Sequence, residues 1–446
     1  MPGQTSLPRQ TQAQTQTTNY LIPTIIIGIL FFVFGFVTWL NSTLINFLKI
    51  ACEIDNNVVL FFVTFAFYIS YFVMAIPSSW VLKVTGFKKG MSVGLVVMAV
   101  GALIFIPAAT SRTYGLFLLG LFIQGTGLAV LQTASNPYIT ILGPIESAAK
   151  RISIMGIFNK VAGAISPLIL SAAILSGADI LEKKISVATD AAEKAQLLNG
   201  LAAKVIGPYI IMAIVLFLLA IWIWFSNLPE VDQKEEEEEE DDPEIKQRRS
   251  IFQFPHLWLG VIALFFYVGC EVLAGDTIGQ YGRMLGYDIS HYQNFTTYTL
   301  SFMVIGYIIG IILIPKYVTQ RKALQFCSIL ALVFSICAIF TSGWVTVFFI
   351  TLLGLANAVM WPAIWPLALN KLGHFTKTGA ALLVMAIAGA AVLPLIWGAI
   401  ANKTTDHPQW AYILLIPSYT VILYFATGGY LAGLKKKNLL KEEVTV

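Results

Sequence analysis

Long apolar runs separated by short polar segments dominate the chain. Twelve of these runs reach or approach the ~20 residues that a helix needs to cross the hydrocarbon core of a bilayer. The predicted helices are Tyr20–Leu48, Val58–Leu82, Met91–Ala109, Tyr114–Leu142, Ile152–Leu175, Val205–Phe225, Leu257–Leu285, Tyr292–Ile314, Ala323–Phe340, Trp344–Leu369, Ala380–Ala401 and Trp410–Leu434. The pattern therefore predicts an all-α membrane protein with 12 transmembrane helices.

Composition supports the same class. Of 446 residues, 57% are hydrophobic and 12% are charged, whereas a soluble domain carries about 25% charged residues. This excludes a soluble enzyme, a disordered chain and a nucleic-acid-binding protein, and it makes the lipid bilayer the expected surroundings. The four cysteines lie mostly in apolar runs, so no disulfide framework is predicted.

The basic residues predict the orientation. With both termini placed in the cytoplasm, the inner loops and tails hold 19 Lys and Arg residues and the outer loops hold 8. Half of the outer group lies in one long loop, 176–204, whose length weakens its influence. Cytoplasmic N- and C-termini are therefore predicted, and this topology requires an even number of spans.

Polar segments divide the chain into five parts. Residues 1–19 form a polar Gln/Thr-rich segment that predicts a disordered cytoplasmic tail, and residues 435–446 form a second tail. The acidic stretch within 227–254 is too charged to pack and predicts a solvated cytoplasmic linker. Between these lie an N-terminal six-helix bundle, 20–226, and a C-terminal six-helix bundle, 255–434.

The two halves resemble each other. The segment KVTGFKK, which begins at Lys83, matches KYVTQRK, which begins at Lys316, in the spacing of its basic residues. Gln132 precedes a proline by five residues in the fourth predicted helix, and Asn357 does the same in the tenth. Two halves inserted in the same direction form a parallel repeat, a common architecture of secondary transporters.

Polar side chains within the predicted spans are the candidates for function, because burying them without a partner is costly. Amides and hydroxyls beside indole rings suit a sugar, whose hydroxyls need donors and acceptors and whose apolar ring face stacks on an aromatic group. The same side chains can instead form bonds between helices or simply pack, and that alternative stays open. The candidate sugar-binding residues are Asn41, Ser42, Gln132, Asn136, Asn357, Trp361 and Trp365.

Three ionisable residues lie within predicted helices. Lys160 is in the middle of the fifth, Glu271 is in the middle of the seventh, and Asp276 is nearer the outer end of the seventh. One cation and two carboxylates leave one negative charge. We therefore expect Lys160 to pair with one carboxylate while the other binds a proton or a sodium ion during transport. The alternative is a hydrated Asp276 in an outer vestibule beside a structural Lys160–Glu271 pair.

Motifs of enzymatic chemistry are not found in the sequence. It has no phosphate-binding loop of the Walker type, no Gly-x-Ser-x-Gly elbow and no His-rich metal motif. We expect no enzymatic activity and no cofactor, and any transport is expected to be driven by an ion gradient or to be passive.

Three segments resemble the fucose permease branch of the major facilitator superfamily. They are FFVFGFVTWLN in the first helix, VLKVTGFKKG after the second and LQTASNPYITILGP in the fourth. The resemblance covers about 21–434, and within that branch the chain looks like the bacterial glucose/galactose transporters. It implies the major facilitator fold, with two parallel-repeat six-helix bundles, alternating access between them, and a central cavity lined mainly by the first, fourth, seventh and tenth helices.

The chain departs from the fucose permease pattern at two positions. An aspartate often follows the asparagine of the first helix, where this chain has Ser42, and a glutamate often opens the TAxNP motif, where it has Gln132. Neither side chain titrates near neutral pH, so coupling is expected to depend on Glu271, Asp276 or another group, or to be lost. Amides still bind hydroxyls, so a sugar-binding role for Gln132 and Asn136 remains compatible with the resemblance.

These observations predict a monomeric sugar importer of the bacterial inner membrane, working by cation symport on a glucose/galactose-type hexose. A passive sugar uniporter is one alternative, and fucose or an amino sugar is an alternative substrate. A sugar sensor without flux and a multidrug exporter are less well supported, because the tails offer no signalling domain and the amide set is of the sugar-binding type.

Overall fold

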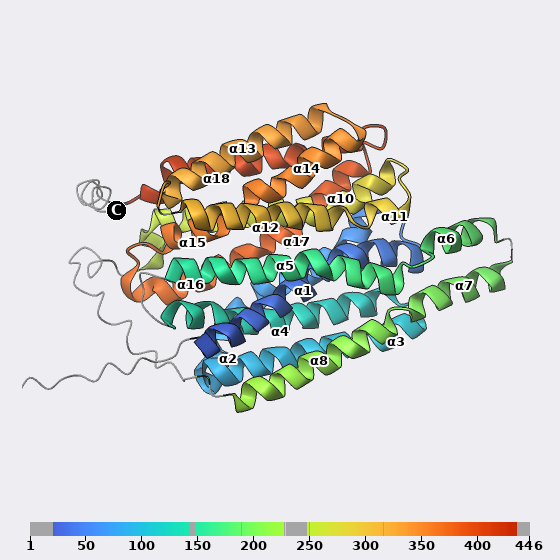
Figure 1. Ribbon diagram of the computed structural model, residues 1–446, viewed down its shortest axis with the longest axis horizontal. Coiled ribbons are helices and arrows are strands. Elements are labelled where there is room, and N and C mark those ends of the chain that lie inside the picture. The colour runs from blue at the N-terminus through green and yellow to red at the C-terminus, as the bar shows by residue number, and fades with distance from the viewer. Residues whose placement is uncertain are drawn as a thin grey trace, which may run out of the picture.

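The computed structural model describes residues 21–142, 148–188, 190–226, 228, 248, 250–314 and 316–434. Within these ranges the regular elements are all helices, which run roughly parallel to the long axis of the molecule (Figure 1). The first half contains α1 (Leu21–Ala51), α2 (Asn57–Leu103), α3 (Phe105–Ser111), α4 (Tyr114–Ile141), α5 (Ala148–Ile174), α6 (Ala178–Val187), α7 (Ala191–Ala203) and α8 (Ile206–Phe225).

The second half repeats this arrangement with more interruptions. It contains η3 (Ile251–Gln253), α10 (Pro255–Met284), α11 (Ile289–Tyr292), α12 (Phe295–Leu313), α13 (Gln320–Phe340), α14 (Gly343–Asn357), α15 (Met360–Leu369), η4 (Gly373–Phe375), α16 (Thr376–Met385), η5 (Ala386–Ala388), α17 (Gly389–Ala401), η6 (Pro408–Leu414), α18 (Leu415–Thr427) and η7 (Gly429–Leu431). Most of the predicted acidic linker and both predicted tails lie outside the described residues.

Ten helices of the described residues are long and apolar enough to cross a membrane, or eleven when the bent pair α14–α15 is taken as one span. One of the ten, Asn57–Ser111, has 55 residues. A straight helix of that length would measure about 80 Å, far beyond the ~30 Å of a hydrocarbon core. The backbone of this segment leaves helical geometry at Gly86, with φ 75° and ψ 174°. Dividing it there would give twelve spans, and the number twelve stays a prediction.

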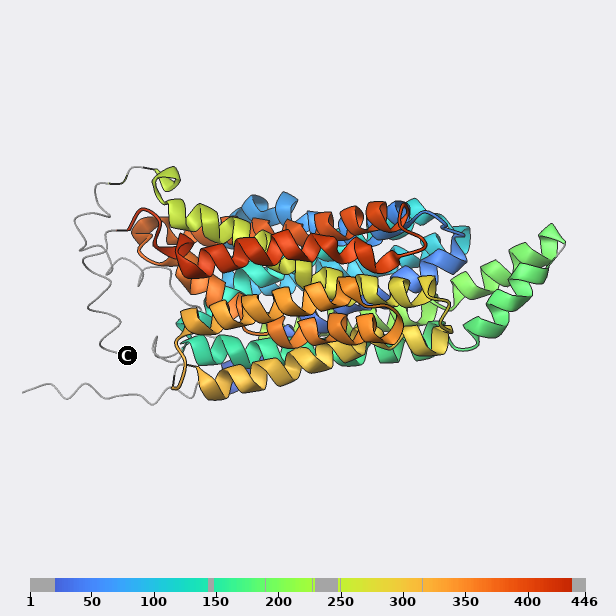
Figure 2. The ribbon, with the colours of Figure 1, turned by 90° about the horizontal axis from the view of Figure 1, so that it is seen from above.

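Two loops expected from the sequence are helical in the structure. The basic segment after Leu82 has helical structure on both sides of Gly86, whose positive φ suits a residue without a side chain. The long outer loop 176–204 forms α6 and α7, a helical hairpin that extends beyond the bundle (Figure 2). These two short helices are rich in charged residues, so the segment does not contain the apolar run that predicts a transmembrane helix.

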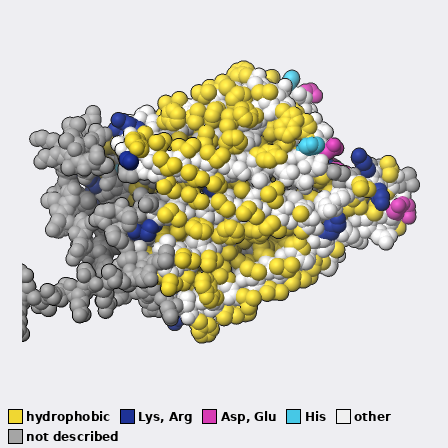
Figure 3. Space-filling model, viewed as in Figure 1, with side chains coloured by type: hydrophobic (Ala, Val, Ile, Leu, Met, Phe, Trp, Pro, Cys, Tyr) yellow, Lys and Arg dark blue, Asp and Glu magenta, His cyan; other side chains and the backbone are white. Residues whose placement is uncertain are grey.

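The bundle has two distinct ends. α1 begins, and the described residues end at Leu434, at the end that we call the inner end (Figures 1 and 2). The opposite end, from which α6 and α7 project, is called the outer end. Between the ends the visible face is covered mainly by hydrophobic side chains, and the Lys and Arg side chains lie near the two ends (Figure 3). This distribution matches a bilayer-spanning protein.

Burial separates interior helices from those on the surface. Residues 30–51 of α1, 120–139 of α4, 263–284 of α10 and 349–365 of α14–α15 contain no exposed side chain. By contrast, α8 exposes Ile211, Leu218 and Phe225 by 64%, 59% and 77%. Four helices, two from each half, therefore occupy the interior, so polar side chains on them are screened from lipid.

Candidate functional site

An ion pair joins the two halves in the middle of the bundle. The Lys160 ammonium on α5 contacts the Glu271 carboxylate on α10, and both residues are buried, with 9% and 7% exposure. Of the two partnerships that the sequence left open for Lys160, the structure therefore has the one with Glu271. A buried ion pair contributes little net stability, but either partner alone would be strongly unfavourable.

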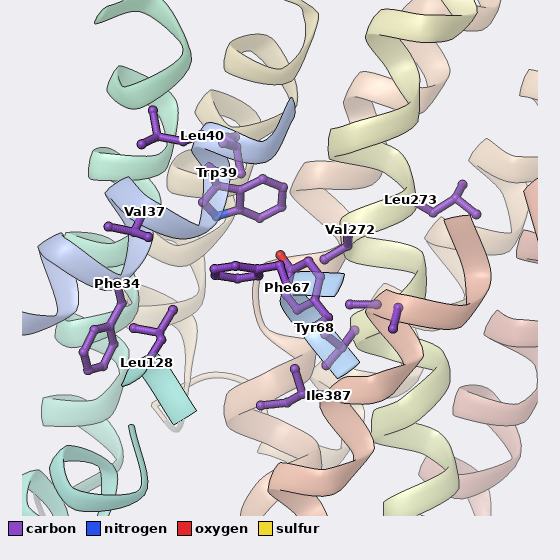
Figure 4. Packing of buried hydrophobic residues seen from close by; sticks show 14 of the residues in the cluster. Phe34, Val37, Trp39, Leu40, Phe67, Tyr68, Leu128, Val272, Leu273 and Ile387 are labelled. Carbon is purple, nitrogen blue, oxygen red and sulfur yellow. The ribbon is translucent and has the colours of Figure 1, made fainter. Parts of the chain in front are cut away.

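The indole of Trp39 lies directly beside this pair. The Lys160 Nζ sits 5.0 Å from the centre of the Trp39 ring, within the range of a cation–π interaction. The ring points from α1 toward α10, where Val272 is seen close to it (Figure 4). Trp39 is 1% exposed, and its indole nitrogen Nε1 has no hydrogen-bond partner in the described part of the chain.

Two glycines make room for the Trp39 ring. A Cβ atom added to Gly163 on α5 would lie 2.4 Å from Trp39 Cδ1, and one added to Gly275 on α10 would lie 2.3 Å from Trp39 Cζ3. No side chain tolerates contacts this short without rearrangement. The ring is therefore held between the two bundles by the absence of side chains at these two positions.

Asp276 occupies a separate position on the same helix. Glu271 and Asp276 are five residues apart, so their side chains leave α10 about 140° apart. Asp276 is 2% exposed, and its Oδ2 accepts a hydrogen bond of 3.1 Å from the fully buried Thr64 on α2. Its Oδ1 has no hydrogen-bond partner among the described residues. The structure thus differs from the alternative of a hydrated Asp276 in an outer vestibule.

Further bonds join the halves at the outer end. Gln280 on α10 donates to the Asn57 side chain on α2 at 2.9 Å, and the Asn57 backbone N–H donates to Asn402 after α17 at 3.1 Å. Arg283 forms an ion pair with Glu182 on α6. Most of the residues that make these contacts also border a hollow of about 570 Å³. The hollow is lined by Lys49, Asp55, Asn56, Asn57, Gln280, Arg283, Met284, Asn402 and Thr405.

The polar residues of α1 are buried in the bundle. Asn41 and Ser42 are 1% and 3% exposed, and the Ser42 hydroxyl donates to the Trp39 carbonyl at 2.9 Å. The Asn46 amide donates to the Ser42 carbonyl at 3.3 Å, which places these two residues on one face of the helix as their spacing predicts. Asn41 Nδ2 and Asn46 Oδ1 find no partner in the described residues.

The candidates on α4 and α15 have a different environment. Gln132 and Asn136 are half-buried, as are Trp361 and Trp365. All four lie in the stretches of α4 and α14–α15 that contain no exposed side chain. The two tryptophans stack on each other, with ring centres 5.3 Å apart and an angle of 23° between planes.

Asn357 is only 1% exposed, so its side chain is less accessible than those of the half-buried candidates on α4 and α15. Its Oδ1 accepts a hydrogen bond of 2.9 Å from the Tyr419 hydroxyl on α18. It ends α14, and the next helix begins at Met360 after a bend of 41°. Pro362 explains the break, because proline cannot donate to the carbonyl four residues earlier. The Pro362 carbonyl accepts a hydrogen bond from the Gln320 side chain.

Sequence reasoning missed Trp39, Thr64 and the two glycines that receive the indole. Trp39 is part of a segment that drew attention only for its likeness to a family, and Thr64 is one hydroxyl in an apolar run. Two glycines in the sequence could have indicated this contact. Gly163 lies three residues after Lys160, and Gly275 lies next to Asp276. Small residues in membrane helices mark close approach.

The arrangement suits movement of a small polar solute between two bundles. Opposite charges, a lone carboxylate and amides lie along one interface, and the described residues hold no cluster of His, Cys, Asp and Glu of the kind that binds a metal ion. Bonds that cross this interface can break and re-form as the halves move.

Comparison with known proteins identifies relatives of this architecture. A glucose/galactose transporter of Brucella abortus is 33% identical over 431 residues, which cover 95% of this chain and 99% of that protein. A putative glucose/galactose transporter of Helicobacter pylori is 31% identical over 90% of this chain and 95% of its own length. The L-fucose-proton symporter of Escherichia coli is 28% identical over 92% of this chain and 94% of its own length.

Solved structures support the same relationship. The crystal structure of the transporter FucP in the outward conformation has a TM-score of 0.71 and 27% identity, and it covers 92% of this chain and 99% of that one. A D-xylose-proton symporter has a TM-score of 0.63 at 14% identity, with 91% of this chain and 98% of that one covered, which is a likeness of fold.

A family model also matches the chain. The model described as Major Facilitator Superfamily matches residues 27–381, a range that contains the α5–α10 ion pair, the α4 amides and the bent α14–α15 pair. The chain belongs to the major facilitator superfamily, in the branch that includes bacterial glucose/galactose transporters and L-fucose-proton symporters.

Proposed function

We propose that this protein imports a hexose of the glucose/galactose type together with a proton, by alternating access between its two halves. The observation that carries the proposal is the set of three buried ionisable groups at the interface of the halves: Lys160, Glu271 and Asp276. Ionisable residues inside a membrane protein mark ion pathways and proton relays. Relatives named as sugar transporters and sugar-proton symporters support the substrate and the coupling ion.

The sugar site that we propose lies between α4 and α15. Gln132 and Asn136 supply amides from one half, and Trp361 and Trp365 supply an aromatic surface from the other. Their partial exposure on helices that are screened from lipid supports this assignment. Asn357, Asn41 and Ser42 are buried in this conformation and take part after a rearrangement that frees their side chains.

The coupling ion is a proton in this proposal. A carboxylate in a nonpolar interior takes up a proton more readily than it stays charged, and the trio holds one more acidic group than Lys160 can balance. Sodium coupling, which the sequence left open, is not supported by the names of the relatives described above. Uptake under a sodium gradient tests it as the competing ion.

We further propose a monomer in a bacterial inner membrane, with the inner end and both termini in the cytoplasm. The bacterial relatives and the predicted excess of Lys and Arg in the inner loops support this placement. The bonds that close the outer end then correspond to a state in which the periplasmic side is shut.

Transport in proteoliposomes tests the proposal. We expect labelled glucose to exchange with internal glucose, galactose to compete, and net accumulation to follow an inward proton gradient but not a sodium gradient. Exchange without accumulation under either gradient would instead indicate a uniporter, and absence of exchange would indicate a sensor. Uptake of structurally unrelated hydrophobic compounds without competition among sugar stereoisomers would indicate an exporter.

A further inference from the structure

The two buried carboxylates of α10 have different surroundings, and this difference suggests different roles. Glu271 has its counter-ion in Lys160, whereas Asp276 has one hydrogen bond from Thr64 and an Oδ1 without a partner. An ionised carboxylate accepts several hydrogen bonds, so a single donor leaves it poorly satisfied. A neutral carboxylic acid fits this position much better than an ion does.

We propose that Asp276 carries the transported proton, and that the outer end closes with Thr64 against Asp276 only when Asp276 is protonated. This inference rests on the function proposed above and assigns the coupling within that site. In this scheme Lys160 and Glu271 stay charged and paired at the centre of the interface. Asp276 is the group that changes its protonation during the cycle.

The bond between Thr64 and Asp276 crosses the interface between the halves. Thr64 belongs to α2 of the first half and Asp276 to α10 of the second. Asn57 and Gln280 meet farther toward the outer end, about two turns along α2 and one turn along α10. Opening the outer end separates α2 from α10 and admits water to Asp276. The acid then exchanges its proton with the outer solution.

Closing the outer end removes that water, so an ionised Asp276 would be buried without a counter-charge. This is strongly unfavourable in a nonpolar interior, and it holds the unprotonated carrier open to the outside. A protonated Asp276 has no such penalty, and the outer end closes. Loss of the proton to the inner side makes the closed arrangement unfavourable again, which returns the carrier to the outward state.

The charges around Asp276 support this assignment. Tyr68 on α2 is a titratable group that faces it, and Glu271 on its own helix is balanced by Lys160. The helices α12, α14, α15, α17 and α18, which also pack against α10, contain no Asp, Glu, Lys, Arg or His. The charged groups close to the outer end of α10 include Lys49, Asp55, Asp288 and His291, together with the Arg283–Glu182 ion pair.

The decisive variant is Asp276→Asn, which resembles the protonated acid. A proton gradient of one pH unit drives up to about tenfold accumulation when one proton moves with each sugar. We expect wild-type proteoliposomes to approach this ratio for labelled glucose. Asp276→Asn should keep glucose exchange within about threefold of the wild-type rate, reach an accumulation ratio of one, and show no sugar-dependent proton uptake by an internal pH dye. Asp55→Asn, an exposed carboxylate at the same end, is the matched control.

Two results would overturn the inference. One is proton-driven accumulation by Asp276→Asn at the wild-type ratio, and the other is wild-type accumulation that follows sodium and ignores pH. Both leave sugar transport intact, whereas absence of glucose exchange in the wild type rejects the proposed function itself.

Thr64 provides an independent test should Asp276→Asn lose exchange altogether. Thr64→Val removes the donor that crosses the interface and should slow proton-driven uptake about fivefold. Thr64→Ser keeps the hydroxyl and should restore the wild-type rate. Equal rates in wild type, Thr64→Val and Thr64→Ser would overturn the role of this bond in closure.

Discussion

The outer and inner parts of the interface between the two halves are built differently. Toward the outer end the halves meet through single bonds between short side chains, Thr64 with Asp276 and Asn57 with Gln280, and through an indole held between two glycines. Toward the inner end, Gln132 and Trp361 remain half-buried on helices that are screened from lipid. The outer part is closely packed, and the inner part leaves polar and aromatic side chains partly exposed.

This difference shows how the interface can close at one end and still open again. A close approach of backbones depends on residues that lack side chains, and each bond across it contributes only about 1 kcal/mol. Such a closure forms and breaks as a unit when the halves rock. The ion pair between Lys160 and Glu271 lies between the two parts, where charge has to stay balanced in this conformation.

The largest expected effect comes from removing one member of that pair. Glu271→Gln or Lys160→Met alone leaves a buried charge uncompensated, and we expect a loss of about 3–5 kcal/mol in stability together with loss of uptake. The double variant Lys160→Met/Glu271→Gln should recover most of the stability, because no charge is then left buried. Thermal unfolding in detergent measures this. Equal destabilisation in the single and double variants would show that the pair does not form.

The close packing of Gly163 and Gly275 against the Trp39 ring can be tested by adding a methyl group to either glycine. Gly275→Ala or Gly163→Ala places a methyl group against the indole, and we expect a destabilisation of the closed outer end by about 1–3 kcal/mol. Proton-driven uptake should fall roughly tenfold to a hundredfold. Gly115→Ala and Gly207→Ala are matched controls, because an added Cβ meets no atom within 4 Å there. Uptake reduced to the same degree in controls and test variants would contradict the role of the glycines.

The inner part of the interface is tested through sugar affinity. Gln132→Ala and Trp361→Ala remove a hydrogen-bonding amide and a stacking surface, and each should weaken glucose binding by about 1–2 kcal/mol, or roughly fivefold to thirtyfold in Kd. Trp222→Ala on the exposed surface of α8 is the control. Equilibrium binding of labelled glucose to purified protein gives the comparison. Unchanged affinity in both variants would place the sugar elsewhere.

Much of this could be predicted from the sequence, and the limits have physical causes. Apolar runs fixed α1, α4, α5 and α10 to within a few residues, because a hydrocarbon core imposes length and composition. The bend at Asn357–Met360 lies beside Pro362, whose missing N–H acts locally, within a run that was predicted as one helix, Trp344–Leu369. The basic segment around Gly86 was expected as a loop, but the backbone is helical on both sides of Gly86, which alone leaves helical geometry.

The pairing of side chains could not be predicted in the same way. Lys160 had two carboxylates within reach along α10, and the choice of Glu271 depends on how α5 and α10 are rotated about their own axes. That rotation is set by packing over both helices, in which Gly163, Gly275 and the Trp39 ring determine the closest approach. Thr64 became visible only once the register of α2 against α10 was known.

The smallest effect is expected at the rim of the outer end. Gln280→Ala removes the hydrogen bond to Asn57, and Asn402→Ala removes the acceptor of the Asn57 backbone N–H. Because each bond lies beside the hollow that opens to solvent, water can replace the lost partner, and we expect about 0.5–1 kcal/mol per variant. Uptake should change about twofold to fivefold, less than in Gly275→Ala. A larger loss in Gln280→Ala than in Gly275→Ala would mean that the outer end is closed mainly by its rim rather than by the contact of Trp39 with the glycines.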